Sequence, residues 1–247
     1  MNLGEDIEIC EDEFITLDAG EGFDYYLWNT GDTTQKISIT ESGTYSIQAS
    51  TLSSCSNDIK NGLSAYYPFN GNANDASGNG HHGESVNGVD FTIEDRFGEY
   101  PSSAAGFDGE DDYINVTDNS QLNFPESDFS ISVWVNANEI TSSPKHIIDK
   151  RAGSGAGTGY NLLIDNTDQT FLLALQGGSP NVNLHSTTTV DELTWYHIVA
   201  VVDRDNSITQ LFIDGDLESQ MGSIDFNLEN SGDLSIGQRF NNTDYFN

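Results

Sequence analysis

Residues 129–137 read Phe-Ser-Ile-Ser-Val-Trp-Val-Asn-Ala. Successive side chains of a β-strand point to opposite sides of the sheet, so this segment has two different faces. One face is apolar and carries Phe129, Ile131, Val133 and Val135. The other carries Ser130, Ser132, Trp134 and Asn136. This alternation predicts a half-buried strand in an antiparallel sheet.

Similar strand signals surround this segment. Residues 195–202 are apolar on both faces, which predicts a central strand. Residues 211–216 read Leu-Phe-Ile-Asp-Gly-Asp, which predicts a strand entering a tight Asp-Gly hairpin. Helical periodicity is nearly absent, and roughly ten strand candidates fall within residues 61–247. The sequence therefore predicts an all-β domain, a two-sheet antiparallel jelly-roll sandwich.

The first 60 residues are a separate block that contains the only two cysteines, Cys10 and Cys55. Strand-like runs lie between them, at residues 14–17, 25–28, 36–40 and 44–49. We expect a small Ig-like β-sandwich over residues 1–60, followed by the jelly roll over residues 61–247. A disulfide between the cysteines would add about 3–4 kcal/mol of stability and would indicate an oxidising compartment. Two free thiols in a cytosolic protein are the alternative.

The charge of the chain is almost entirely negative. Forty Asp and Glu residues face eight Lys and Arg residues, for a formal net charge of −32. Nucleic acids and anionic membranes are bound through clustered Lys and Arg, so both partners are excluded. No apolar run is long enough to span a membrane, which argues against membrane insertion.

Five segments of the second block form a recognisable order: residues 63–83, 107–114, 129–135, 195–199 and 211–215. Together they resemble the laminin G-like jelly rolls of the concanavalin A-like lectin/glucanase group, over about residues 62–247. The first 60 residues resemble, more weakly, the Ig-like repeats of multidomain bacterial surface proteins. That second resemblance rests on the two cysteines, Trp-Asn-Thr-Gly at residues 28–31 and Ser-Gly-Thr-Tyr at residues 42–45.

The resemblance also predicts a closing strand, roughly Gly-x-Ile-Asp-x-Val-Arg-Ile-Tyr, that does not follow residues 244–247. We therefore expect a fragment that lacks a strand near a sheet edge. The first ten residues have no basic or apolar region typical of a signal peptide. We interpret the chain as an internal piece of a secreted or cell-surface bacterial protein, with an extracellular location; a cytosolic protein is the alternative.

Catalytic patterns are weak. Retaining glycosidases of this fold use two carboxylates on one strand, and Asp214, Asp216 and Glu218 have the nearest spacing. Asp214 belongs to the predicted hairpin turn, however, so the three cannot line one continuous strand. Ser154 lies in a Gly-rich stretch that does not lead from a strand into a helix, as a nucleophile elbow requires. We expect no enzymatic activity.

Calcium is the expected structural cofactor. It prefers six to eight oxygen ligands, which acidic loops rich in Asn and Gly supply. Two loops have suitable residues, namely Asn70 and Asp75 in the first and Asp108 and Asp112 in the second. The resemblance points first to Asp75 as a ligand. The alternative is that these residues only form turns and bind nothing.

The aromatic residues suggest carbohydrate binding, because sugar rings stack on exposed Trp and Tyr while amides orient the hydroxyls. The candidate ligand-binding residues are Trp134, Asn136 and Tyr160. For Trp134, the alternative is a place in the packing. We expect a non-catalytic carbohydrate-binding or adhesion module for a polysaccharide or glycoprotein glycan, with neutral or cationic glycans favoured by the charge. One alternative is a structural or protein-interaction module, with a cell-surface protein as partner, that accompanies a catalytic domain elsewhere in the full-length chain. A glycoside hydrolase is a less favoured alternative.

Overall fold

The protein was analysed as a computed structural model that describes residues 14–23, 25–30, 32–50, 62–98, 103–153, 157–222, 224–240 and 243–247. The chain divides into two compact units, Met1–Leu63 and Ser64–Asn247. Among the described residues, no helix is long and apolar enough to cross a membrane.

In the described part of the N-terminal unit there are two antiparallel strand pairs. Strand β1 (Ile15–Asp18) pairs with β3 (Lys36–Ile39), and β2 (Tyr25–Trp28) pairs with β4 (Ile47–Ser50). Trp28 is 1% exposed and packs with Ala19 and Ile37 into a small core. Cys10 and Cys55 lie outside the described residues, so the disulfide and the Ig-like assignment stay predictions.

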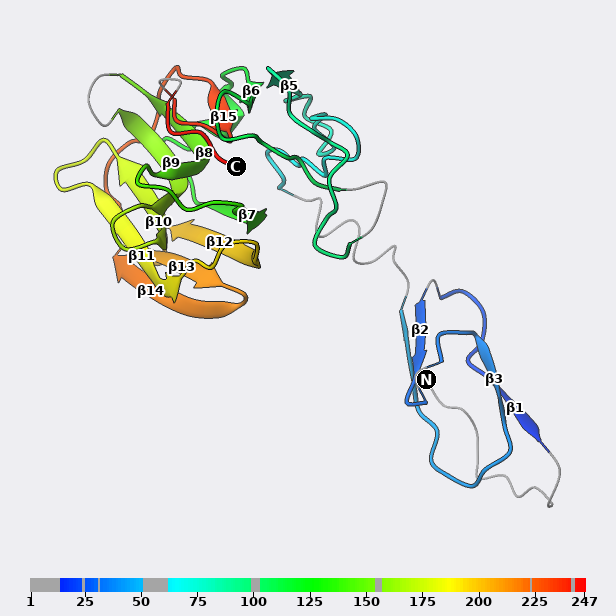
Figure 1. The fold of residues 1–247 in the computed structure, drawn as a ribbon. Coiled ribbons are helices and arrows are strands. Elements are labelled where there is room, and N and C mark those ends of the chain that lie inside the picture. Colours follow the sequence, from blue (N-terminus) through cyan, green and yellow to red (C-terminus); the bar gives the residue numbers. More distant parts are fainter. Residues whose placement is uncertain are drawn as a thin grey trace. The chain divides into compact units, whose positions relative to one another are not determined.

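The C-terminal unit is all-β and forms two antiparallel sheets (Figure 1). Among the described residues, the larger sheet has seven strands in the order β11-β10-β9-β8-β15-β6-β5, and the smaller has four in the order β14-β13-β12-β7. The larger sheet is built from β5 (Gly83–Val86), β6 (Tyr113–Val116), β8 (Lys145–Ala152), β9 (Thr158–Asp165), β10 (Thr170–Gln176), β11 (Val182–Thr189) and β15 (Leu234–Ile236). The smaller is built from β7 (Phe129–Asn136), β12 (Trp195–Asp203), β13 (Ile208–Ile213) and β14 (Asp216–Gly222).

The main core lies between these two sheets, because one buried cluster draws residues from both. Phe171 and Leu173 of β10 belong to it, as do Ile198 and Ala200 of β12, all at most 1% exposed. The predicted two-faced strand at residues 129–135 is confirmed: Phe129 and Val135 are buried, Ile131 and Val133 are half-buried, and the alternate residues are exposed. The jelly-roll sandwich predicted from the strand pattern is therefore confirmed.

The Asp-Gly hairpin is also confirmed. Asp214 and Gly215 join β13 to β14 with backbone φ angles of +52° and +92°. A two-residue loop with two positive φ angles matches the right-handed twist of the flanking strands, and Gly adopts such angles at little cost. This turn places Asp214 outside the strand that carries Asp216 and Glu218.

Candidate functional site

A row of polar side chains crosses the outward face of the seven-stranded sheet. Directly opposite residues in neighbouring antiparallel strands project from the same side of a sheet. The strand register aligns one residue from every strand, and only the sixth is apolar: Glu84, Asn115, Ser235, Asp149, Asn161, Ala174 and Asn183. Their sequence neighbours Ile114, Ile236 and Leu162 belong to the cores, so this polar row faces outward.

The middle of the polar row is sunk below the surface. Ser235, Asp149 and Asn161 are 4%, 0% and 1% exposed although they face away from the core. A cavity of about 470 Å³ opens beside them over β6, β15 and β8. We call this cavity the groove; its lining is Tyr113, Asn115, Arg151, Ala152, Gly153, Gly232, Asp233, Ser235, Gln238 and Phe240.

Two buried oxygen atoms at the groove have no hydrogen-bond donor among the described residues. They are Oε1 of Gln238, which lines the groove and is 2% exposed, and Oδ1 of Asn161, on the polar row. A buried acceptor without a donor costs about 1–3 kcal/mol. Natural structures contain few of them, and each calls for an explanation such as a missing ligand or water. Both are amide oxygens, which accept hydrogen bonds from hydroxyl or N–H donors.

Three side chains of β8 form a charged cluster on the same face. Nε of Arg151 donates to Oδ1 of Asp149 at 2.8 Å, and its Nη2 donates to Oδ2. Nδ1 of His146 lies 3.2 Å from the same Oδ2. Burial alone would raise the pKa of Asp149, but the hydrogen bonds from Arg151 and the nearby His146 ring hold it below its ordinary value. Asp149 is thus kept as a carboxylate that is fully engaged with its neighbours.

Aromatic rings provide apolar surface at the groove. Tyr113 and Phe240 line it from β6 and from the segment after β15, and both are half-buried. The Cζ atom of Arg151 lies 5.1 Å from the centre of the Phe240 ring. The groove therefore combines ring surfaces with hydrogen-bond acceptors, the two elements of a sugar-binding site.

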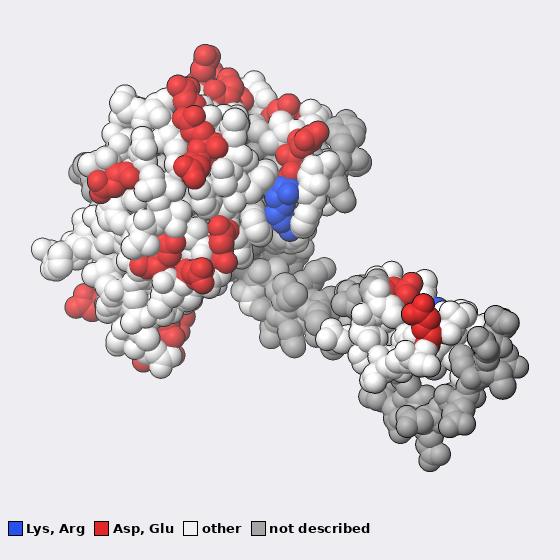
Figure 2. All heavy atoms as spheres, turned by 60° about the horizontal axis from the view of Figure 1, so that its bottom comes forward, with Lys and Arg blue, Asp and Glu red and all other residues white. Residues whose placement is uncertain are grey.

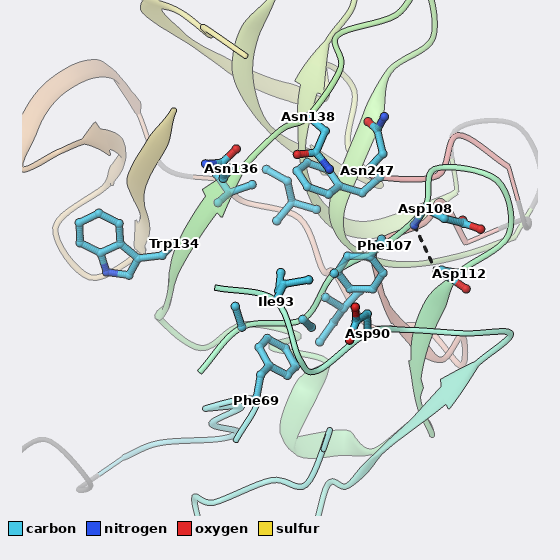
Figure 3. A pocket seen from close by; sticks show the side chains of 18 of the residues that line it. Phe69, Asp90, Ile93, Phe107, Asp108, Asp112, Trp134, Asn136, Asn138 and Asn247 are labelled. Atoms are coloured by element: carbon cyan, nitrogen blue, oxygen red, sulfur yellow. Dashed lines mark hydrogen bonds between the residues drawn. The ribbon is translucent and has the colours of Figure 1, made fainter. Parts of the chain in front are cut away.

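A second cavity, of about 710 Å³, lies at the edge of the small sheet (Figure 3). Asn136, Asn138 and Asn247 approach one another there, above Phe107 and Ile93. Backbone N–H of Asn138 donates to the carbonyl of Asn247 at 3.0 Å. The amide cluster gives this cavity some polarity, but much of its lining is apolar and shared with the cores.

Three carboxylates meet at the rim of the second cavity. Asp108, Asp111 and Asp112 each place an oxygen within 4.8 Å of the others. Asp108 Oδ1 accepts hydrogen bonds from the backbone N–H groups of Glu110 and Asp111, and Asp112 Oδ2 accepts from Asp108 N. Burial and the charge of Asp108 raise the pKa of Asp112. We call this group the acidic cluster; its remaining oxygens are hard ligands of the kind calcium prefers.

Comparison with known proteins decides the family. The family model described as the concanavalin A-like lectin/glucanases superfamily matches residues 108–247, which is more than half of the chain. The chain belongs to this superfamily. No curated protein sequence matches this concanavalin A-like chain.

Solved structures resemble the concanavalin A-like unit in fold. Domain 4 of AbnA, a GH43 extracellular arabinanase from Geobacillus stearothermophilus solved with arabinotriose, has a TM-score of 0.55 and 17% identity, over 72% of this chain and 84% of that chain. The CBM40 domain of Ruminococcus gnavus IT-sialidase, bound to α2,3-sialyllactose, has a TM-score of 0.40 and 15% identity, over 47% and 68%. The binding domain of botulinum neurotoxin serotype D has a TM-score of 0.49 and 16% identity, over 66% and 40%.

The residues predicted to contact a ligand are separated in this concanavalin A-like fold. Trp134 is 42% exposed, but its ring stacks on the His197 imidazole at 4.8 Å, and Cζ of Arg96 lies 4.7 Å from its centre. Trp134 lines the second cavity, but in Figure 3 its ring lies apart from the amides of Asn136, Asn138 and Asn247. Tyr160 is 3% exposed and donates its hydroxyl to the carbonyl of Leu122. The prediction that Tyr160 contacts ligand is wrong, because its strand position points into the core.

The predicted convergence of two loops on one cation is also wrong. Asp108 and Asp112 do come together, but Asp75 lies outside the acidic cluster. The Asp75 carboxylate accepts four hydrogen bonds, from the N–H groups of Tyr66, Ser77 and His81 and from the Ser77 hydroxyl. Oδ1 of Asn70 accepts from Ser103 Oγ at 2.7 Å. Asp75 therefore ties a loop together and has no lone pair left for calcium.

These hydrogen bonds predict an acid-dependent loss of stability. Burial alone would raise the pKa of Asp75, but the donors of Ser77, Tyr66 and His81 lower it from 3.8 to about 2. A lowered pKa in the folded state stabilises the fold above pH 3.8, and this contribution is lost as the pH falls through about 2. We expect Asp75→Asn to lower the unfolding free energy by about 1–3 kcal/mol at pH 7. Denaturant titrations should show the gap to the wild type closing towards pH 2; a gap independent of pH would contradict this.

The carboxylates with glycosidase-like spacing serve the structure. Glu218 accepts hydrogen bonds from the backbone N–H groups of Thr187 and Thr188 and from both hydroxyls, which ties β14 to β11. Asp214 Oδ1 accepts from His197 N at 2.8 Å in the hairpin turn. These two carboxylates are occupied with different neighbours, which accords with the expectation that they do not act as a catalytic pair.

The groove residues carry only a faint signal in the sequence. Asn161 interrupts an otherwise apolar run, Tyr-Asn-Leu-Leu at residues 160–163, whereas Asp149 begins the charged triplet Asp-Lys-Arg at residues 149–151. A single polar residue inside an apolar strand costs free energy unless it has a partner. That signal marks individual positions, but it does not show that they lie side by side.

Proposed function

We propose that the concanavalin A-like unit is a non-catalytic carbohydrate-binding module and that its glycan lies in the groove. The observation that carries this proposal is the buried, undonated oxygen of Gln238 in a groove that the rings of Tyr113 and Phe240 also line, with a second such oxygen at Asn161 on the polar row. Sugar hydroxyls would donate to the oxygens while the apolar side of a sugar ring contacts an aromatic ring. The shared fold with AbnA domain 4, solved with arabinotriose, supports this assignment.

Among the described residues, the carboxylates at and beside the groove are held by hydrogen bonds. Asp149 is held by Arg151, and Asp233 accepts hydrogen bonds from Nδ2 of Asn115 and the N–H of Asp118. A general acid must keep its proton near neutral pH, which requires a raised pKa, whereas the pKa of Asp149 is lowered. The carboxylates at this site therefore support binding rather than bond cleavage.

A glycan screen tests the proposed function. Protein shown to be folded would be applied to immobilised neutral and acidic oligosaccharides, and every hit would be incubated further to detect released sugar. We expect binding to at least one polysaccharide or glycoprotein glycan, without release of product. No binding by folded protein, or turnover of a bound glycan, would contradict the proposal.

We also propose that this module acts outside the cell and that the N-terminal unit is an Ig-like spacer. Extracellular polysaccharides and glycoprotein glycans are the ligands that fit the groove chemistry. A disulfide between Cys10 and Cys55 would agree with such an environment. Intact mass after alkylation, with and without prior reduction, would show whether the two thiols are joined.

We also propose that the acidic cluster binds a structural calcium ion. Neutralising three nearby carboxylates would remove their mutual repulsion and fix the loop that carries them. Calcium at 100 times its dissociation constant should raise the unfolding free energy by about 2.7 kcal/mol. The double variant Asp111→Asn, Asp112→Asn should lose this response, and Asp205→Asn, an exposed residue elsewhere, should keep it. An unchanged melting temperature in calcium and in chelator would exclude the site.

A further inference from the structure

We infer that the groove selects uncharged glycan chains and excludes carboxylated sugars such as uronates and sialic acids. This inference rests on the proposed function, because it concerns the ligand of the same groove. Three observations carry it: the groove arginine is already paired, the neighbouring cations are also paired, and the rim of the groove carries the carboxylate of Asp233.

Arg151 is the only Lys or Arg among the described residues that line the groove, and its guanidinium is paired with Asp149. It is 5% exposed, and two of its nitrogens donate to both oxygens of Asp149. Paired parallel hydrogen bonds of this kind are how arginine recognises a carboxylate. Asp149 therefore occupies the position that a ligand carboxylate would need. Displacing it would leave a buried Asp149 without its partner, which is strongly unfavourable.

The nearest other cations have partners of their own. Lys150 follows on the opposite side of β8, where its Nζ donates to Asp118, Asn123, Asn230 and the carbonyl of Gly232. Arg239, next to Gln238, lies 3.3 Å from Asp244. Each of these positive charges is balanced within the fold, so neither is poised to attract an anionic sugar.

The rest of the groove favours hydroxyl donors. Asp233 adds a carboxylate at the rim, Gln238 in the lining has an undonated oxygen, and Asn161 has another on the polar row. Like charges at such a site are repelled, and an anion would bring further acceptors to groups that need donors. Asp and Glu also outnumber Lys and Arg over the visible surface (Figure 2). A neutral sugar brings hydroxyl donors to these oxygens and adds no negative charge beside Asp233.

The test uses matched neutral and acidic probes. Neutral arabino- and galacto-oligosaccharides would be titrated beside oligogalacturonate and sialyllactose, with Asp149→Asn and the exposed control Asp205→Asn. We expect the wild type and Asp205→Asn to bind a neutral probe at least tenfold more tightly than any acidic one. Asp149→Asn frees Arg151 and should gain at least tenfold in affinity for an acidic probe.

A second variant keeps the test valid if Asp149→Asn does not fold. Asp233→Asn removes one exposed rim carboxylate and should raise the affinity for acidic probes about threefold at low salt, with a smaller gain at 0.15 M salt. If the wild type binds an acidic probe and Arg151→Gln loses that binding, the inference is overturned but the carbohydrate-binding function stands. Binding of no glycan by folded protein would overturn both.

Discussion

Replacing Lys150 with Met is expected to lower the unfolding free energy of the concanavalin A-like unit by about 3–5 kcal/mol. Lys150 is 0% exposed, and its three ammonium N–H groups are shared among four oxygens that lie 2.6–3.2 Å from Nζ. These acceptors come from the segments before β7 and before β15, so one ammonium group joins two loops to β8. The substitution removes the donor and leaves a carboxylate and three neutral oxygens without it.

Lys145→Met is the matched control for this prediction. Lys145 is on the same strand and is 6% exposed. Burial lowers its pKa, and no hydrogen bond from its Nζ is present among the described residues. We expect this variant to change the unfolding free energy by no more than about 1 kcal/mol. Denaturant unfolding measures both variants; equal losses would show that the Lys150 network contributes little.

The second large effect is on ligand affinity. The double variant Asn161→Leu, Gln238→Met replaces the two undonated oxygens with apolar groups of similar size. Two lost hydrogen bonds of about 1–1.5 kcal/mol each should weaken glycan binding roughly 30- to 150-fold. The same change should leave the unfolding free energy unchanged or raise it by about 1 kcal/mol, because buried acceptors without donors are removed.

A double variant that binds glycan more weakly but is at least as stable as the wild type indicates a binding role for the two oxygens. A structural role would instead lower the stability. Calorimetric titration with the best neutral glycan gives the affinity, and denaturant unfolding gives the stability. Trp134→Ala serves as the control, since Trp134 projects from the other sheet, and its affinity should stay within about twofold of the wild type. A double variant that retains full affinity, or that loses affinity together with stability, would contradict the assignment of these oxygens to the ligand.

The fold could be predicted because its signals are local. Alternation over residues 129–135 sets the inward face of one strand, and Asp214-Gly215 sets the hairpin between two others. Each signal depends on neighbours in the chain, and the motif order then identified the family. The position of Tyr160 could not be predicted in this way. Its aromatic ring is suited to contact a sugar, but the strand register turns the side chain into the core.

The groove could not be predicted because its residues meet through strand register. Asn115, Asp149, Asn161 and Ser235 lie on four strands, and their alignment depends on the order β6-β15-β8-β9, in which β15 enters late in the chain between two earlier strands. The error at Asp75 has a related cause. The same spacing of acidic residues in a loop is compatible with calcium binding and with hydrogen bonds from backbone N–H groups. Only the folded loop shows that backbone N–H groups reach the Asp75 carboxylate.

The most direct test of the binding site is an amide chemical-shift titration of ¹⁵N-labelled protein with the neutral oligosaccharide that binds best in the glycan screen. Our account predicts the largest shift changes at residues 113–115, 149–151, 161 and 235–238, with little change at Trp134 and His197. Changes centred on Trp134 and His197, with the groove residues unaffected, would contradict it.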